Sequence, residues 1–198
     1  MTTPHSAAGF FGKFPSHGDF VARRLPAGFL QPWDAWLQAG MADSVCRLGD
    51  AWLPIYLNSP IWRFALGAGV CGPQAWGGVL MPSVDRVGRY FPLTIAAGLD
   101  GMATQGSGCR PPPAIWYASL EAMALAALGD EFSLPTFDAS LLALAPARAA
   151  REIPGELPGS ALFWLGDDSP PAAPSLMLSP RALAASLFTE LLLADVRD

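Results

Sequence analysis

Residues 79–95 read VLMPSVDRVGRYFPLTI, and two apolar runs in this stretch flank a short polar segment. The runs at residues 79–81 and 90–95 are short, rich in Val, Leu, Ile and aromatic residues, and bounded by Pro or Gly. This pattern is typical of strands that are buried on both faces. Pro82 ends the first strand, because proline cannot donate to a sheet ladder. The stretch therefore predicts two neighbouring core strands joined by a polar turn.

The polar turn carries three charges, at Asp85, Arg86 and Arg89, in a chain of which only 15% is charged. We expect Ser83 to cap one helical turn and Gly88 to end it in the left-handed conformation. An Asp–Arg pair that only pins the turn would explain the charges structurally. The alternative is that so apolar a protein uses charges placed between two core strands for binding. The residues alone leave both explanations open.

Composition predicts one domain, residues 1–198, with enough apolar surface for a full core, because 52% of the 198 residues are hydrophobic. The net charge of −5 argues against nucleic acid as the main partner. The charge is uneven: residues 1–100 carry +1 and residues 101–198 carry −6. Eleven of the twelve basic residues are Arg, so a cationic surface would favour forked, directional contacts.

Cysteine usage and hydropathy predict a cytosolic protein. Cys46, Cys71 and Cys109 are far apart and lie at no metal-ligand spacing from His, which predicts reduced thiols and no structural zinc. The first residues lack the charged and apolar regions of a signal peptide. The uncharged residues 64–84 are long enough to span a bilayer, but five Gly and two Pro divide them into strands and a loop. We therefore expect no membrane insertion.

Hydrophobic periodicity predicts the remaining elements and the fold class. We expect strands at residues 9–14, 61–66, 76–81, 89–97 and 161–165, with a short edge strand at 176–178. We expect helices at residues 29–48, 50–57, 115–128, 137–150 and 180–194. Because unbroken apolar strands need cover on both faces, these elements predict an α/β three-layer sandwich. Its single sheet would be mixed but largely antiparallel, with helices on both faces.

Residues 67–72 match the pattern GxGxxG, which in dinucleotide-binding proteins follows a strand and opens a helix. Pro73 follows at once, and the next strand is expected from residue 76. This leaves no room for a helix whose N-terminus would face a pyrophosphate. We therefore expect a glycine-rich hairpin loop and no cofactor.

Ser16, His17 and Asp19 have the side chains of a hydrolase triad, but neighbouring side chains diverge and a triad needs groups from separate elements. No G-x-S-x-G motif occurs in the chain, and two histidines are poor material for a metal site. A loop in which Gly18 permits a tight bend is the simpler explanation. A small hydrolase that uses His17 with Ser16, Ser83 or Asp85 stays open as an alternative.

Four motifs occur in order between residues 9 and 97: GFFGKFPSHGDFVARRLP, WDAWLQ, PIWRFALGAG and WGGVLMPSVDRVGRYFPLT. These motifs resemble the TagF (ImpM) family of type VI secretion system-associated proteins, for which no catalytic residues are established. The resemblance implies a bacterial, cytoplasmic accessory protein that restrains assembly of the secretion apparatus after translation. It implies a forkhead-associated scaffold protein as partner and leaves a PP2C-type phosphatase open as a second one. Residues 98–198 match weakly, mainly through the strand ALFWL and the closing helix.

Three classes of function are consistent with these residues: a non-enzymatic regulator that binds a partner, the small hydrolase, and a structural subunit of the secretion apparatus.

We expect the loop at residues 13–19 and the polar turn to meet at one end of the sheet. We expect Lys13 and Arg86 to be exposed, and Arg89→Ala to cost ~3–5 kcal/mol by leaving Asp85 unpaired. The binding hypothesis assigns these residues: Lys13, Ser16, His17, Gly18, Asp19, Arg63, Ser83, Asp85, Arg86 and Arg89.

Overall fold

The protein was analysed as a computed structural model that describes residues 7–99, 112–144, 161–166, 176–178 and 183–194. Its strands are β1 (Gly9–Gly12), β2 (Val21–Arg23), β3 (Trp62–Leu66), β4 (Trp76–Met81), β5 (Leu93–Gly98), β6 (Ala161–Trp164) and β7 (Leu176–Leu178). Its helices are α1 (Ala27–Leu48), the 3-10 helix η1 (Gly49–Ala51), α2 (Trp52–Asn58), α3 (Ala114–Ala126), α4 (Leu134–Ala143) and α5 (Ala185–Leu193). None of the helices in these ranges is both long and apolar enough to cross a bilayer.

The strands form a seven-stranded sheet in the order β2-β1-β5-β4-β3-β6-β7. Every pairing between the described strands is antiparallel. The predicted α/β class with a largely antiparallel sheet is thus confirmed, whereas the parallel component of a mixed sheet is absent from the described strands. The reason is that β6 pairs with β3 in the antiparallel sense, although a long helical segment precedes it and would also have allowed a parallel pairing.

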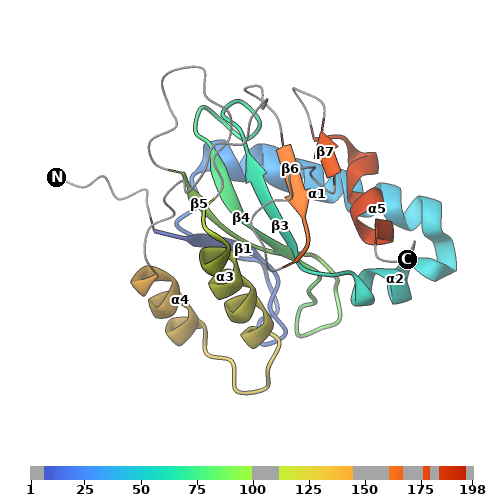
Figure 1. Ribbon diagram of the computed structural model, residues 1–198. Coiled ribbons are helices and arrows are strands. Elements are labelled where there is room, and N and C mark those ends of the chain that lie inside the picture. Colours follow the sequence, from blue (N-terminus) through green and yellow to red (C-terminus); the bar gives the residue numbers. More distant parts are fainter. Residues whose placement is uncertain (1–6, 100–111, 145–160, 167–175, 179–182, 195–198) are drawn as a thin grey trace.

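Side chains alternate between two hydrophobic clusters along the strands. In β3, Phe64 belongs to one cluster and its neighbour Ala65 to the other, because successive residues of a strand point to opposite faces. The cluster of Ala65 also contains residues of α3 and α4, and the cluster of Phe64 contains residues of α1, α2 and α5. Figure 1 shows α3 and α1 on opposite sides of the central strands.

Helix α5 lies close against α1, and Gly40 in α1 permits this approach. A Cβ at that position would come within 2.4 Å of the Phe188 side chain. Trp36 of α1 adds a hydrogen bond from its indole nitrogen to the Ala184 carbonyl oxygen, at 2.9 Å. The C-terminal helix is therefore held to the first long helix by both packing and polar contact.

The element boundaries differ from expectation where side chains rather than periodicity decide them. Strand β5 begins at Leu93 instead of residue 89, because residues 89–92 complete the turn and Pro92 has no amide to donate. The exposed three-residue strand β2 was not predicted, since it is too short for an alternating pattern. The helix expected at residues 137–150 is α4, which ends at Ala143, and residues 145–150 lie outside the described residues.

The glycine-rich segment 67–72 forms a tight loop between β3 and β4. The Gly69 amide donates to the Gly72 carbonyl oxygen at 2.8 Å, and Gly72 adopts a φ of 86°. No helix begins between residues 67 and 75, all of which the structure describes. The loop therefore lacks the helix N-terminus that a dinucleotide fingerprint requires.

Candidate functional site

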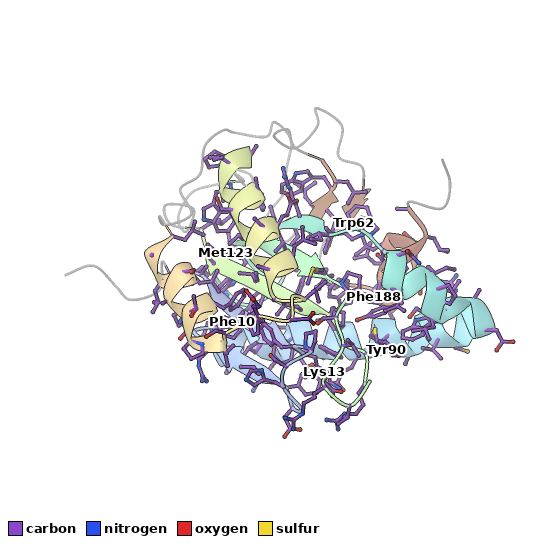
Figure 2. All side chains as sticks on the ribbon, turned by 90° about the horizontal axis from the view of Figure 1, so that it is seen from below. Phe10, Lys13, Trp62, Tyr90, Met123 and Phe188 are labelled. Carbon is purple, nitrogen blue, oxygen red and sulfur yellow. The ribbon has the colours of Figure 1, made fainter. Side chains whose placement is uncertain are left out.

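Two segments distant in sequence meet at one end of the sheet: the loop at residues 13–20, after β1, and the turn at residues 82–92, between β4 and β5. The Arg86 amide donates to the His17 carbonyl oxygen at 2.9 Å, which joins the two directly. In Figure 1 both segments project below the strands, and Figure 2 labels Lys13 in the view of that end. The predicted convergence of loop and turn is confirmed.

Asp85 is the centre of this arrangement. Its Oδ1 accepts from the amides of Val87 and Arg89 at 3.0 and 2.9 Å, which folds the turn around the carboxylate. Its Oδ2 accepts from Lys13 Nζ at 3.0 Å and from Arg89 Nε at 2.7 Å. The side chain has no exposed surface. One buried carboxylate thus holds two cations and two amides from both segments.

These donors decide the ionisation of Asp85. Burial by itself raises the pKa of the carboxyl, since it disfavours the charged form. The hydrogen bonds from the Arg89 amide, the Lys13 ammonium, the Arg89 guanidinium and the Val87 amide outweigh burial and hold the pKa of Asp85 well below its usual range. The carboxylate is therefore ionised at neutral pH and acts as a fixed structural acceptor.

Ser83 braces the base of the turn, although not as the helix cap that we expected. Its hydroxyl donates to the Lys13 carbonyl oxygen at 2.7 Å. Tyr56 of α2 donates its hydroxyl to the Ser83 carbonyl oxygen at 2.8 Å and accepts from the Ser83 amide at 3.0 Å. Only Gly88 behaves as expected, with a φ of 85°. No sequence pattern linked Tyr56 to the turn, because its spacing marked it only as an inward residue of a short helix.

Lys13 is buried, contrary to our expectation, because Phe20 covers it. The Lys13 ammonium lies 5.0 Å from the centroid of the Phe20 ring. That ring also stacks on Phe11 at 5.6 Å and meets Phe91 edge-on at 4.8 Å, yet 49% of Phe20 remains exposed. Phe20 therefore shields the Lys13–Asp85 pair on one side and presents an open aromatic surface on the other. This role of Phe20 was not predicted from the sequence, because residue 20 was assigned to a loop.

The outer rim of the site is cationic and apolar. Arg86 is exposed, and in the part of the chain that the structure describes its guanidinium enters no ion pair. Val87, at the tip of the turn, is 65% exposed. Arg89 is held from one side, because its guanidinium donates to the Gly18 carbonyl oxygen and lies 3.6 Å from the exposed Asp19 carboxylate. More than half of the Arg89 side chain nevertheless remains accessible.

Arg63 does not belong to this site, which corrects the grouping made from the sequence. It is the second residue of β3 and has no exposed surface. Its Nε and a terminal nitrogen donate to the two carboxylate oxygens of Glu121 in α3, at 2.6 and 2.8 Å. Glu121 is the one charged residue in the apolar sequence of helix α3, and this was the sequence signal for the pair.

Only some of the side chains that the hydrolase alternative requires lie close together. The Ser16 hydroxyl and His17 Nδ1 lie 2.8 Å apart, so these neighbouring side chains do approach, contrary to our expectation. Ser83 and Asp85 do not join them, because the Ser83 hydroxyl donates to a carbonyl and four donors occupy the Asp85 carboxylate. In the described ranges, no three His, Cys, Asp or Glu side chains gather as a metal site would require.

The fold and the site define a mixed α/β protein that presents a braced cationic turn at one end of an antiparallel sheet. The chain belongs to the TagF family of type VI secretion system-associated proteins. The family model described as TagF N-terminal domain, Type VI secretion system-associated, matches residues 9–144. The crystal structure of PA0076 from Pseudomonas aeruginosa PAO1 is similar to this chain, with a TM-score of 0.75 and 32% sequence identity over 94% of each chain. No curated protein matches the chain.

Proposed function

We propose that this protein is a non-enzymatic, cytoplasmic regulator that restrains assembly of the type VI secretion system after translation. It does so by binding a forkhead-associated scaffold component through the loop and turn at the end of the sheet. Membership of a type VI secretion system-associated family supports an accessory role in that system. The resemblance that first indicated the family supports the identity of the partner.

The observation that carries the proposal is the contrast between the buried base of the turn and its exposed tip. The base is fixed by Asp85, Lys13 and Ser83, all of which are buried. The tip exposes Arg86 and Val87, which no structural contact in the described chain requires to be cationic or apolar. Arginine and apolar groups on a rigid support bind partners well, because little entropy is lost on association.

The test is binding of the purified forkhead-associated component to the full chain. We expect Arg86→Glu with Val87→Asp to weaken binding at least about tenfold, which corresponds to 1.4 kcal/mol. Arg47→Glu is the matched control, since Arg47 is an exposed arginine of α1 away from the turn. In cells, the double variant should release secretion and the control should not. Normal binding and normal repression by a folded double variant would refute the proposal.

The Ser16–His17 contact favours a hydrolase as the second candidate function. One variant distinguishes the hydrolase from the binding regulator. Ser16 is exposed, so its substitution leaves the braced turn intact. If Ser16→Ala represses secretion and binds the partner as the wild type does, the hydrolase is not needed for the function. A structural subunit would instead be recovered in fixed ratio with the assembled apparatus.

A further inference from the structure

A groove lies between α3 and α4, next to the site but outside it. Its volume is about 370 Å³, and its apolar lining comes from Met123, Phe132 and Phe137. Hydroxyl groups of Ser133 and Thr136 also line it. Volume and lining resemble those of ligand-binding pockets, which are mostly apolar with a few polar groups.

Phe14 joins this groove to the proposed docking site. Its ring stacks on Phe132 with centroids 5.2 Å apart and planes 15° apart, and it meets Phe137 edge-on at 5.6 Å. On its other side it contacts the His17 ring at 6.2 Å. Figure 1 shows the loop between α3 and α4, in yellow, below the sheet with the 82–92 turn. The turn and the loop that joins α3 to α4 therefore lie at the same end of the molecule (Figure 1), and Phe14 contacts residues of both regions.

The rim of the groove is acidic, whereas the turn is cationic. The described segment 112–144 contains no Lys or Arg. Two of its four carboxylates are neutralised, Glu121 by Arg63 and Asp138 by Arg24. Asp130 and Glu131 are exposed and form no ion pair with a cation in the described chain. The two ends of the face thus differ in sign.

We propose that the groove is the second half of the docking face and takes an apolar side chain of the partner that is flanked by Lys or Arg. This inference rests on the proposed function, because the same forkhead-associated component would meet Arg86 with acidic groups. Opposite charges at the two ends allow only one orientation of the partner, since the reversed orientation would place like charges together. The apolar side chain contributes most of the binding free energy, and the charges fix the position and orientation of the partner.

Filling the groove tests the apolar contact. Ala126 is exposed and lines the groove, so Ala126→Trp occupies the space with little change to the core. Ala122→Trp is the matched control, because Ala122 is also exposed on α3 but does not line the groove. We expect at least about tenfold weaker binding of the purified forkhead-associated component by the first variant, and wild-type affinity for the second.

Charge reversal tests the acidic rim. We expect Glu131→Arg to weaken binding several-fold at low salt, with a smaller difference at high salt because counterions screen exposed charges. Glu190→Arg in α5 is the control, because Glu190 is an exposed glutamate on another part of the surface.

Wild-type affinity for both Ala126→Trp and Glu131→Arg would overturn the inference while leaving the turn as the site. Weak binding by these two variants, with normal binding by the Arg86→Glu, Val87→Asp variant, would refute the turn as a binding site and overturn the two-part docking face. Absence of binding by the wild type would overturn both proposals.

Discussion

Two buried ionic groups occupy different regions of this molecule and have different consequences. The Arg63–Glu121 pair lies between the middle of the sheet and α3, and it links two elements of the core. The Asp85 group lies at the sheet end, where it links the Lys13 segment to a turn whose tip is exposed. Both satisfy a buried charge with close hydrogen bonds, but only the second fixes the shape of an accessible surface.

A buried charge in an apolar chain does not by itself mark a functional site. Arg63 stands out in the sequence as a charge within an apolar strand, yet in the fold it pairs with Glu121 of α3 inside the core. Asp85 is equally buried, but its four donors determine where Arg86 and Val87 stand. The informative feature is therefore what the buried group supports. This difference can be tested by separating effects on stability from effects on binding.

The largest expected effect is that of Asp85→Asn, which should lower both stability and partner binding. The neutral amide keeps only one acceptor oxygen and carries no negative charge, so Lys13 would be left buried without its counter-charge. We expect a greater loss of stability in urea unfolding than for any other substitution considered below. A variant as stable as the wild type would contradict the central place given to Asp85.

Acid unfolding provides a second measurement on Asp85. The ordinary pKa of Asp is about 3.9, and the folded protein holds the pKa of Asp85 below that value. The stabilisation from the ionised carboxylate is therefore complete above about pH 4 and is lost as the pH falls toward the lower folded pKa. We expect wild type to lose more stability than Asp85→Asn between pH 5 and strong acid. Equal losses would show that this carboxylate is not the linked group.

The next largest effect is expected for Glu121→Gln, and on stability alone. The substitution keeps the shape of the side chain but removes the negative charge of Glu121 from beside the Arg63 guanidinium. We expect a loss of about 3 kcal/mol, at the lower end for a broken buried pair, because 21% of the Glu121 side chain is accessible to water. The folded variant should bind the partner with wild-type affinity by calorimetry. Weaker binding would place Arg63 back in the functional site.

Arg89→Ala should cost only about 1 kcal/mol, less than the ~3–5 kcal/mol expected from the sequence. Two observations account for the revision: Lys13 still holds Asp85, and 57% of the Arg89 side chain is exposed. Chemical unfolding of the variant checks the value. A loss above about 3 kcal/mol would mean that Lys13 does not compensate.

The smallest effect on stability is expected for Arg86→Glu, within about 0.5 kcal/mol of wild type, because the side chain is exposed and unpaired in the described chain. Its backbone amide, which donates to His17, is unchanged by the substitution. Thermal unfolding checks this value alongside the binding measurement. A large loss of stability would mean that the tip of the turn is structural.

Lys13→Glu would be a mild surface change if Lys13 were exposed as the sequence predicts, but it is unsuitable as a binding test. Lys13 is only 5% exposed and lies 3.0 Å from a buried carboxylate, so the variant would place two carboxylates against each other. The functional test therefore moves to Arg86 and Val87.

Much of the fold could be predicted from the sequence because the core strands are continuous apolar runs with clear ends. Strand β4 and the edge strand β7 begin and end at the predicted residues. Prediction failed where a boundary depends on side-chain hydrogen bonds, as at the delayed start of β5, or where an element is as short as β2. Neither leaves a periodic signal in the chain.

Part of the candidate site was predicted from the sequence. The polar turn and the loop were recognised because charges between apolar runs are conspicuous, and their convergence was predicted from strands that share one sheet. The covering role of Phe20 and the bracing by Tyr56 were not foreseen, since both depend on contacts between residues far apart in the chain. The α3–α4 groove was not foreseen either, because its link to the site is the ring of Phe14 stacked on Phe132.

The apolar strands, the turn between β4 and β5, the uneven charge and the family motifs can all be recognised in the amino-acid sequence alone. All of these are local patterns, because burial on a strand or a bend at Gly88 leaves a trace in neighbouring residues. The pairing of the charges, by contrast, depends on the folded chain, which places Arg63 beside Glu121 and both Lys13 and Arg89 beside Asp85. A cation pairs with the carboxylate that folding brings within hydrogen-bonding distance, and sequence separation does not encode that distance.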